Sequence, residues 1–583
     1  MDPKILFINF SFRHIADNFF PYGVYCLMTY LRKNGLVNNT FYNIDLLRPT
    51  KEAAIQYIIE QSPDVVAISS PVSTGYASCK YYSAAIKQHL ANTTMILGGN
   101  LAASAEIILK KTDIDFCFLG EGEISLLQFI KQYFPDKSLE NVKQIQGIAY
   151  LDNGDLIING YGQSLDKNKI YDVDYELIDD ITLNHYCPKI NDLDKESHIY
   201  KSLFSKVYAN VELHSHVIGE TRSIIMLTSR GCVNRCTFCH RFVEGIKILP
   251  VDIVIARMRQ LIDKLNIAIF YLGDECFGVD KKWLISFCAA IKPLNVIWIV
   301  GGMRASSVNP ELLELMYQAG CRTIFYGLES GSQNILDIME KKISAPQGIN
   351  AIKWTLEAGI FTTIQMVIGM PGEDVETLKE SEETLNILGK CHPNHDVSNL
   401  SINFTQALPG TPVYEYARSQ NVIGTTMETE EQYLLDISDT NAAKWSLNLT
   451  NLSALQLQYW KLRLQLIMKA SYISHFGLLA YYKNILKIQS LRTFISMLFS
   501  LRGIYSLFPN IIYAIKPLLW IVAIFRTIRS GERIIASGQQ LAHVPKTKSL
   551  RKSLETDIHW DFSGNSQMIQ LRKGNTKEWK KTS

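Results

Sequence analysis

The sequence lacks the features that mark several classes of protein. Its 59 Lys and Arg residues nearly balance 56 Asp and Glu residues, and a net charge of +3 gives no reason to expect a nucleic acid partner. No internal repeat or low-complexity tract is evident. With 47% hydrophobic and 10% aromatic residues over 583 positions, the chain is typical of a folded protein of two to four domains.

The sequence also lacks a secretory signal. Met1-Asp2-Pro3-Lys4 leads into an apolar strand that is too short for a signal peptide, so we expect a cytoplasmic protein. The one long apolar stretch, Ile504 to Phe525, is interrupted by Pro509, Lys516 and Pro517. These breaks favour a buried helix pair or a membrane-surface hairpin over a transmembrane span. A peripheral membrane contact through this C-terminal region stays open.

The 11 cysteines do not form a disulfide pattern, because their number is odd and their spacing irregular. Most lie in apolar segments and are expected to be core thiols, including Cys26, Cys79, Cys117, Cys288 and Cys321. Three others, Cys232, Cys236 and Cys239, fall within one short loop, SRGCVNRCTFCHRF at 229–242.

Residues 1 to about 135 predict a doubly wound parallel α/β sheet. Five apolar strands are expected, at 4–10, 40–47, 64–70, 95–99 and 115–123, with helices near 23–33, 51–61 and 76–90. Ligands of such sheets bind beyond the carboxyl ends of the strands. No G-x-G-x-x-G loop is present, so the glycines at these ends belong either to a ligand loop or simply to tight turns.

A second alternation begins at Ser223, after an irregular connection with a small hairpin at 136–220. Six strands are expected, with helices between them that include 251–264, 310–318 and 347–357. The strands are Ile224 to Thr228, Ile267 to Leu272, Val296 to Val300, Thr323 to Gly327, Thr362 to Ile368 and Leu400 to Gln406. Six βα units predict an open partial barrel at 221–422, with functional residues at the carboxyl ends of its strands.

The remaining chain is divided into a helical region at 423–545 and a polar, basic tail at 546–583. The clearest amphipathic run in the helical region is 450–470. The tail is expected to be solvated.

The three-cysteine loop predicts an iron–sulfur site. Three thiolates can hold three irons of a [4Fe–4S] cluster and leave the fourth iron without a protein ligand. A structural zinc site would need four protein ligands, and His240 is the only nearby candidate for the fourth. Adjacent residues such as Cys239 and His240 rarely reach one metal together, and no second ligand pair follows at zinc-finger spacing. The sequence therefore favours the cluster.

Cys-x-x-x-Cys-x-Phe-Cys after the first strand of a partial barrel, with Phe238 before the last cysteine, resembles the radical S-adenosylmethionine (SAM) enzymes. The resemblance implies that the amino and carboxyl groups of SAM chelate the open iron. It also implies that an external donor such as flavodoxin or ferredoxin supplies an electron, which splits a carbon–sulfur bond to give a 5′-deoxyadenosyl radical.

The same resemblance implies SAM contacts at the later strand ends. Leu272 to Glu275 occupies the place of the motif that receives the methionine amino group, although it is not a Gly-Gly-Glu. Arg304 would face the SAM carboxylate, Glu329 the ribose, and the backbone of Val367 to Glu373 the adenine. The implied contacts are Phe238, Gly273, Asp274, Arg304, Glu329, Ser330, Gln365 and Gly369. Each has an alternative interpretation as a turn residue or a solvated side chain.

A Rossmann-like domain joined to this barrel resembles the cobalamin-binding radical SAM subfamily. Together, the two resemblances cover about the first 420 residues. Asp45 after the second strand belongs to this resemblance. The Asp-x-His-x-x-Gly loop of many corrinoid proteins is absent and His14 lacks its neighbours, which implies base-off cobalamin. The alternative is a domain that no longer binds corrin. The implied cobalamin contacts are Pro21, Gly23, Ser70, Pro71, Val72, Ser73, Gly98, Gly99, Gly120 and Glu121.

Together, the resemblances imply an enzyme that cleaves SAM and uses cobalamin to methylate an unactivated carbon of a small molecule. Anaerobic magnesium-protoporphyrin monomethyl ester cyclase shares this architecture, so oxidative cyclisation or rearrangement without methyl transfer is the first alternative. A non-catalytic corrinoid or metal-binding sensor is the second. The sequence nominates no side chain as a general acid or base.

Overall fold

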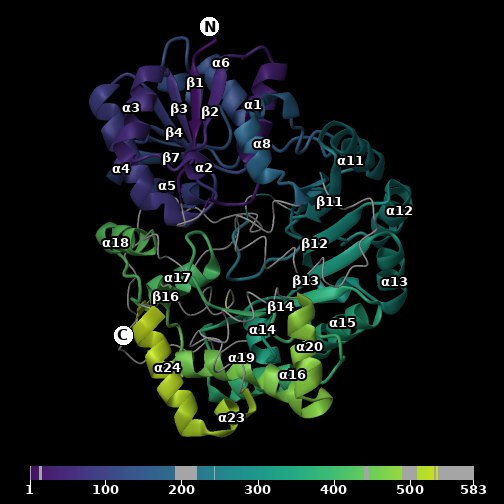
Figure 1. Cartoon of the computed structure of the whole chain (residues 1–583). Coiled ribbons are helices and arrows are strands. Elements are labelled where there is room, and N and C mark those ends of the chain that lie inside the picture. The colour runs from purple at the N-terminus through teal and green to yellow at the C-terminus, as the bar shows by residue number, and fades with distance from the viewer. Residues whose placement is uncertain are drawn as a thin grey trace.

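The computed structural model describes residues 2–11, 16–190, 220–241, 243, 245–438, 445–488, 509–530, 533–535 and 550. An N-terminal α/β domain lies at one end, a second parallel sheet with its helices follows, and a helical region lies at the opposite end (Figure 1). His14 and almost all of the basic tail lie outside the described residues.

The first sheet contains the five predicted parallel strands. Its order is β2-β1-β3-β4-β5-β6-β7, and the last two strands pair antiparallel. The hairpin expected between 136 and 220 therefore extends this sheet as β6 and β7. The bounds are β1 Ile5–Ile8, β2 Asn39–Tyr42, β3 Val65–Ser69, β4 Thr94–Gly98, β5 Phe116–Phe118, β6 Ile148–Asp152 and β7 Asp155–Ile158.

Helices cover both faces of this sheet, which is why its central strands are apolar on both sides. In β1, Leu6 and Ile8 join the core on one face, whereas Ile5 and Phe7 join the core on the other. The first face is covered by α3 (Lys51–Gln61), α4 (Tyr76–His89) and α5 (Ala105–Lys111). The second is covered by α1 (Tyr22–Lys33), α6 (Glu123–Gln132) and α8 (Asp180–Tyr186).

The second sheet is the predicted six-stranded parallel sheet, in the order β15-β14-β13-β12-β11-β8. Shifts in strand register at three of its pairings accompany the curl of this half-barrel. The bounds are β8 Arg222–Met226, β11 Ile267–Leu272, β12 Ile297–Met303, β13 Cys321–Glu329, β14 Phe361–Ile368 and β15 Leu400–Phe404. Because all six strands are parallel, their carboxyl ends share one edge.

Helices cover the outer face of the half-barrel, where Phe270, Trp298 and Ile324 belong to the largest core (Figure 1). These helices are α11 (Val251–Leu265), α12 (Lys281–Ile291), α13 (Pro310–Gln318), α15 (Ala345–Glu357) and α16 (Val375–Gly389). A short helix, α14 (Gln333–Ile338), follows β13.

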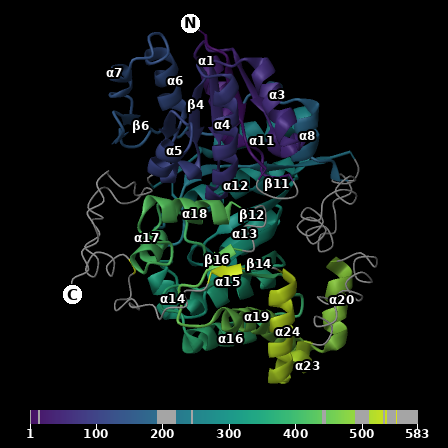
Figure 2. The same ribbon diagram turned by 90° about the vertical axis from the view of Figure 1, so that its left-hand side faces the viewer.

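The C-terminal region contains α17 (Pro412–Ser419), α18 (Met427–Ile437) and the long α19 (Ala454–Phe476). We expected the run at 450–470 to be amphipathic, and this expectation is wrong. The helix α19 is buried along most of its circumference, because α16 packs on it as well as α23 (Pro509–Ala514) and α24 (Lys516–Ser530). In Figure 2, α18 is the helix of this region that lies next to the N-terminal domain, where it contacts α4 and α5.

The described part of the apolar stretch at 504–525 forms the expected pair of helices, α23 and α24, interrupted at Ile515. Leu519 and Ala523 of α24 are buried, whereas Ile521, Ile524 and Phe525 are exposed. Among the described residues, no helix combines the length and the apolar character that crossing a bilayer requires. A membrane contact stays a prediction. Two short parallel strands, β16 (Trp445–Leu447) and β17 (Arg533–Ile535), were not expected.

Candidate functional site

The three-cysteine loop follows β8 and lies inside a small hairpin of β9 (Ser229–Gly231) and β10 (Ile246–Ile248). Cys236 is buried and Cys232 is half-buried. Burial raises the pKa of Cys236. The positive charge of Lys341 lowers this pKa, whereas the negative charges of Glu329 and Cys232 raise it. The described residues contain no three Cys, His, Asp or Glu side chains close enough to surround one metal ion.

Contacts to distant segments hold this loop in place. The Thr237 amide donates to the Met339 carbonyl at 3.0 Å, and the Thr237 carbonyl accepts from the Val413 amide at 3.1 Å. His240 Nε2 lies 2.6 Å from the Pro409 carbonyl oxygen. The ring nitrogen of the one candidate for a fourth zinc ligand is therefore engaged in a hydrogen bond.

Asp274, at the end of β11, anchors the start of the loop. Its Oδ1 accepts from the Thr228 amide at 2.8 Å, from the Ser229 hydroxyl at 2.7 Å and from the Ser229 amide. Its Oδ2 accepts from the Thr228 hydroxyl at 3.0 Å. Burial raises the pKa of Asp274 to about 6. Both oxygens are thus used within the protein, whereas the sequence suggested a contact with SAM.

Three cations surround the cysteine loop. Arg304 donates to Asn234 and to the Lys342 carbonyl at 3.2 Å, and Arg241 Nη2 donates to the Cys232 carbonyl at 2.6 Å. Lys341 Nζ pairs with Glu329 at 2.7 Å. Nε of Arg304 and both Nε and Nη1 of Arg241 are buried without a hydrogen-bond partner in the structure.

These orphaned N–H groups test whether the site fits its expected cofactors. Buried donors in folded proteins almost always find an acceptor, so Arg241 and Arg304 indicate an anionic group at the barrel mouth. A cluster held by thiolates and the SAM carboxylate are both anionic. The residues present therefore fit a [4Fe–4S] cluster with SAM.

Glu329 is held in an unusual conformation, with a φ of 63° at the end of β13. Non-glycine residues adopt this region rarely and most often where the surroundings impose it. The partner that holds its carboxylate, Lys341, was not found from the sequence. Lys341 lies twelve residues after Glu329, beyond the short helix α14, and this spacing does not predict a contact.

The other predicted SAM residues lie along the same edge. Gly273 has little room for a side chain, because a Cβ would lie 3.0 Å from Ile225. The Ser330 hydroxyl is engaged with Ser381, whereas Gln365 is exposed on β14. The Gly369 amide donates to Glu373 at 2.5 Å. Phe238 is half-buried against a core cluster that includes Met339 and Val413 as well as residues of the N-terminal domain.

The inner face of the half-barrel changes character from one side to the other. On β11 and β13, Tyr271 and Phe325 place their ring centroids 6.0 Å apart. On β14 and β15, Gln365, Ser401 and Asn403 are exposed. The inner face is therefore aromatic on β11 and β13 and polar on β14 and β15.

The loops after β3 and β4 form a cradle in the N-terminal domain. Gly99 has a φ of 93°, and a Cβ there would lie 2.3 Å from the Ser70 carbonyl oxygen. The Ser70 amide donates to the Gly98 carbonyl at 2.9 Å. Val72 is 38% exposed, and the Ser73 hydroxyl is buried without a partner. Pro71 lies between them. This apolar, close-packed surface with an orphaned hydroxyl fits the predicted corrin contact.

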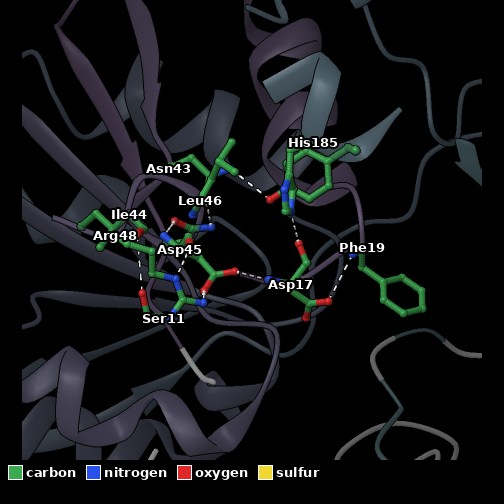
Figure 3. Close-up of polar contacts among 11 residues, drawn as sticks. Ser11, Asp17, Phe19, Asn43, Ile44, Asp45, Leu46, Arg48 and His185 are labelled. Carbon is green, nitrogen blue, oxygen red and sulfur yellow. Dashed lines mark hydrogen bonds and ion pairs between the residues drawn. The ribbon is translucent and has the colours of Figure 1, made fainter. Parts of the chain in front are cut away.

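A polar network holds the segment at 16–20 in place (Figure 3). The Asp17 amide donates to Asp45 at 2.7 Å, and Arg48 pairs with the same carboxylate at 2.7 Å. His185 Nε2 lies 2.8 Å from the Asp17 carbonyl oxygen. The Phe19 ring points away from the network and meets Tyr271 edge-on, with centroids 6.3 Å apart. Asp45 thus positions a loop at the domain boundary.

The remaining predicted corrin residues lie at this boundary too. Gly23, in the first turn of α1 after Pro21, has open space where a Cβ would be. The neighbouring Tyr22 hydroxyl donates to the Ile225 carbonyl of the half-barrel at 2.8 Å. Gly120 has a φ of 87°, and the Glu121 carboxylate pairs with Arg230.

Comparisons with known proteins agree with this arrangement. The B12 binding domain family matches residues 11–130, and the radical SAM superfamily matches residues 226–385. The chain is 25% identical over 431 residues to the anaerobic magnesium-protoporphyrin IX monomethyl ester cyclase of Cereibacter sphaeroides, over 72% of this chain and 64% of that protein. It thus covers less than two thirds of that relative.

Two methyltransferases are also similar. An uncharacterized methyltransferase of Pyrococcus horikoshii is 26% identical over 371 residues, which cover 62% of this chain and 71% of that protein. The cytidylyl-2-hydroxyethylphosphonate methyltransferase of Streptomyces wedmorensis is 23% identical over 345 residues, which cover 56% of this chain and 62% of that protein.

Solved structures share the fold. The cobalamin-dependent radical enzyme OxsB, with aqua-cobalamin and SAM bound, superposes with a TM-score of 0.59 at 15% identity, over 95% of this chain and 78% of that chain. The methyltransferase TsrM of Kitasatospora setae, with cobalamin and a [4Fe–4S] cluster, gives a TM-score of 0.52 at 15% identity, over 73% and 76% of the two chains. The chain therefore contains a B12-binding domain followed by a radical SAM domain, as cobalamin-dependent radical SAM enzymes do, and these two domains imply a [4Fe–4S] cluster, SAM and cobalamin as cofactors.

Proposed function

We propose that the protein transfers a methyl group to an unactivated carbon of a small molecule. The observation that carries the proposal is the meeting of two strand edges. The corrin cradle at Ser70 and Gly99 lies at the carboxyl ends of strands in the first sheet, and the cysteine loop follows the carboxyl end of β8 in the second. The Tyr22–Ile225 hydrogen bond joins the two domains. A substrate in the half-barrel could then face both cofactors.

The chain's own residues have distinct tasks in this proposal. When bound, the cofactors supply a 5′-deoxyadenosyl radical and a methyl group. Cys232, Cys236 and Cys239 hold the cluster, while Arg241 and Arg304 complement its charge and that of the SAM carboxylate. Gly273 and the Gly369 backbone contact SAM, and Glu329 contacts its ribose. Gln365 contacts SAM, and the aromatic inner face holds the substrate and excludes water.

Oxidative cyclisation without methyl transfer is the second candidate. It is favoured by the similarity to the magnesium-protoporphyrin cyclase. The two candidates differ in their SAM products, because only methyl transfer converts SAM into S-adenosylhomocysteine.

Product analysis of the anaerobically reconstituted enzyme separates the candidates. With dithionite, candidate substrates and SAM that carries a deuterated methyl group, we expect 5′-deoxyadenosine, S-adenosylhomocysteine and a product that has gained the label. Mass spectrometry measures all three. Formation of 5′-deoxyadenosine and an altered substrate without S-adenosylhomocysteine would instead establish the cyclase alternative. Absence of SAM cleavage would favour the sensor. An external electron donor stays a prediction.

A further inference from the structure

A buried ion-pair cluster joins the B12-binding domain to the cysteine loop. Arg230 lies in β9, two residues before Cys232. Its Nη1 is 2.7 Å from Glu121 Oε2, and its Nη2 is 2.9 Å from Glu123 Oε1. Glu123 is the first residue of α6, and Glu121 lies two residues before it in the loop after β5. Arg230 therefore bridges two carboxylates of one domain from a strand of the other.

The ion-pair cluster is largely shielded from solvent, and Glu121 has further hydrogen-bond donors. The Arg230 side chain is 12% exposed, and those of Glu121 and Glu123 are 3% and 5% exposed. Glu121 also accepts from the Ser164 hydroxyl at 2.5 Å and from the Leu165 amide at 3.1 Å. The Tyr171 ring lies beneath the guanidinium, with its centroid 4.6 Å from Cζ.

A second cation from the same hairpin faces this cluster. Lys247 of β10 pairs in register with Arg230 and lies 3.6 Å from Glu121. Buried charges of this kind contribute little net stability compared with apolar residues, and their best-attested use is to fix one arrangement among several. A planar guanidinium that contacts two carboxylates restricts both distance and angle.

We propose that Arg230 is a positioning residue that fixes the corrin relative to the iron–sulfur cluster. Glu121 and Glu123 follow Gly120, at the strand edge where the corrin is expected, and Arg230 precedes the first cluster ligand by two residues. Through these ion pairs, the position of the loop after β5 determines the position of the cysteine loop. This inference rests on the proposed function only in requiring that both cofactors bind.

The distance between the two cofactors tests this proposal without turnover. A reduced [4Fe–4S] cluster and cob(II)alamin are both paramagnetic, and their dipolar coupling falls with the cube of their separation. We compare the reconstituted full chain with its Glu123→Gln and Arg230→Met variants by pulsed electron paramagnetic resonance (EPR), at a potential where both centres are paramagnetic. Lys80→Met is the control, because it removes an ion pair that joins the N-terminal domain to α18 of the C-terminal region, Lys80–Glu431.

We expect one narrow distance distribution in the wild type and in Lys80→Met. The distribution should broaden or shift in Glu123→Gln and in Arg230→Met, with iron and cobalt contents unchanged. An unchanged distribution in variants that hold both cofactors would overturn the proposal. Loss of both cofactors even from Glu123→Gln, which keeps the Arg230–Glu121 pair, would also overturn it, since Arg230 would then serve folding alone. Neither result depends on which product the enzyme makes.

Discussion

Replacing Gly99 with valine is expected to release cobalamin while the [4Fe–4S] cluster stays bound. A Cβ at this position would lie 2.3 Å from the Ser70 carbonyl oxygen. The backbone, with a φ of 93° and a ψ of −172°, also lies in a region that essentially only glycine adopts, at a cost of about 1–3 kcal/mol to other residues before any clash. The loop after β4 must therefore move away from the loop after β3. Cobalt and iron analysis of the purified, reconstituted protein measures the effect.

Another glycine of the same domain supplies the control for this experiment. Gly35 shares the positive φ, at 86°, but nothing lies within 4 Å of a Cβ placed there. Gly35→Val should therefore retain cobalamin. We further expect Gly99→Val to cleave SAM to 5′-deoxyadenosine without forming a methylated product. Wild-type cobalt content in Gly99→Val would show that the corrin binds elsewhere.

The second large effect is expected from Cys236→Ala, with the opposite selectivity. Loss of this buried thiolate removes one of the three ligands of the cluster. Iron content should fall and 5′-deoxyadenosine formation should become undetectable, while cobalamin stays bound to the other sheet. Metal analysis and product analysis on one preparation measure all three properties.

Cys276 is the informative control for the cysteine loop. It is 2% exposed and lies beside Cys232, and a hydrogen bond between the two side chains lowers the pKa of Cys232. If Cys276 supports the loop without being a ligand, Cys276→Ala should retain the iron and cleave SAM. Equal losses of iron in the Cys276 and Cys236 variants would argue for a fourth protein ligand.

The sequence predicted the strands well because each carries a local signal. An uninterrupted apolar stretch such as Ile267 to Leu272 has few alternatives to a buried parallel strand. The same local signal misled at 450–470. The period of apolar residues along a helix describes one face, whereas α19 is enclosed by α16, α23 and α24. Burial by elements distant in the chain cannot be read from a window of residues.

The site was predictable where a short motif carries the chemistry and unpredictable where charges pair over long distances. Three cysteines in one loop indicated the cluster directly. Arg230 pairs with two glutamates that lie 109 and 107 positions earlier in the chain, and no local sequence pattern predicts ion pairs over such a separation. The sequence assigned Glu121 to the corrin and Asp274 to SAM, and both assignments stay predictions; it did not indicate the contacts within the protein that engage both carboxylates.

The central claim is that one iron of the cluster has no protein ligand and is open to SAM. Mössbauer spectroscopy of the anaerobic protein reconstituted with ⁵⁷Fe, recorded with and without SAM, tests it most directly. We predict that SAM changes the signal of one iron and leaves the other three unaltered. Four irons that stay alike in the presence of saturating SAM would contradict the account.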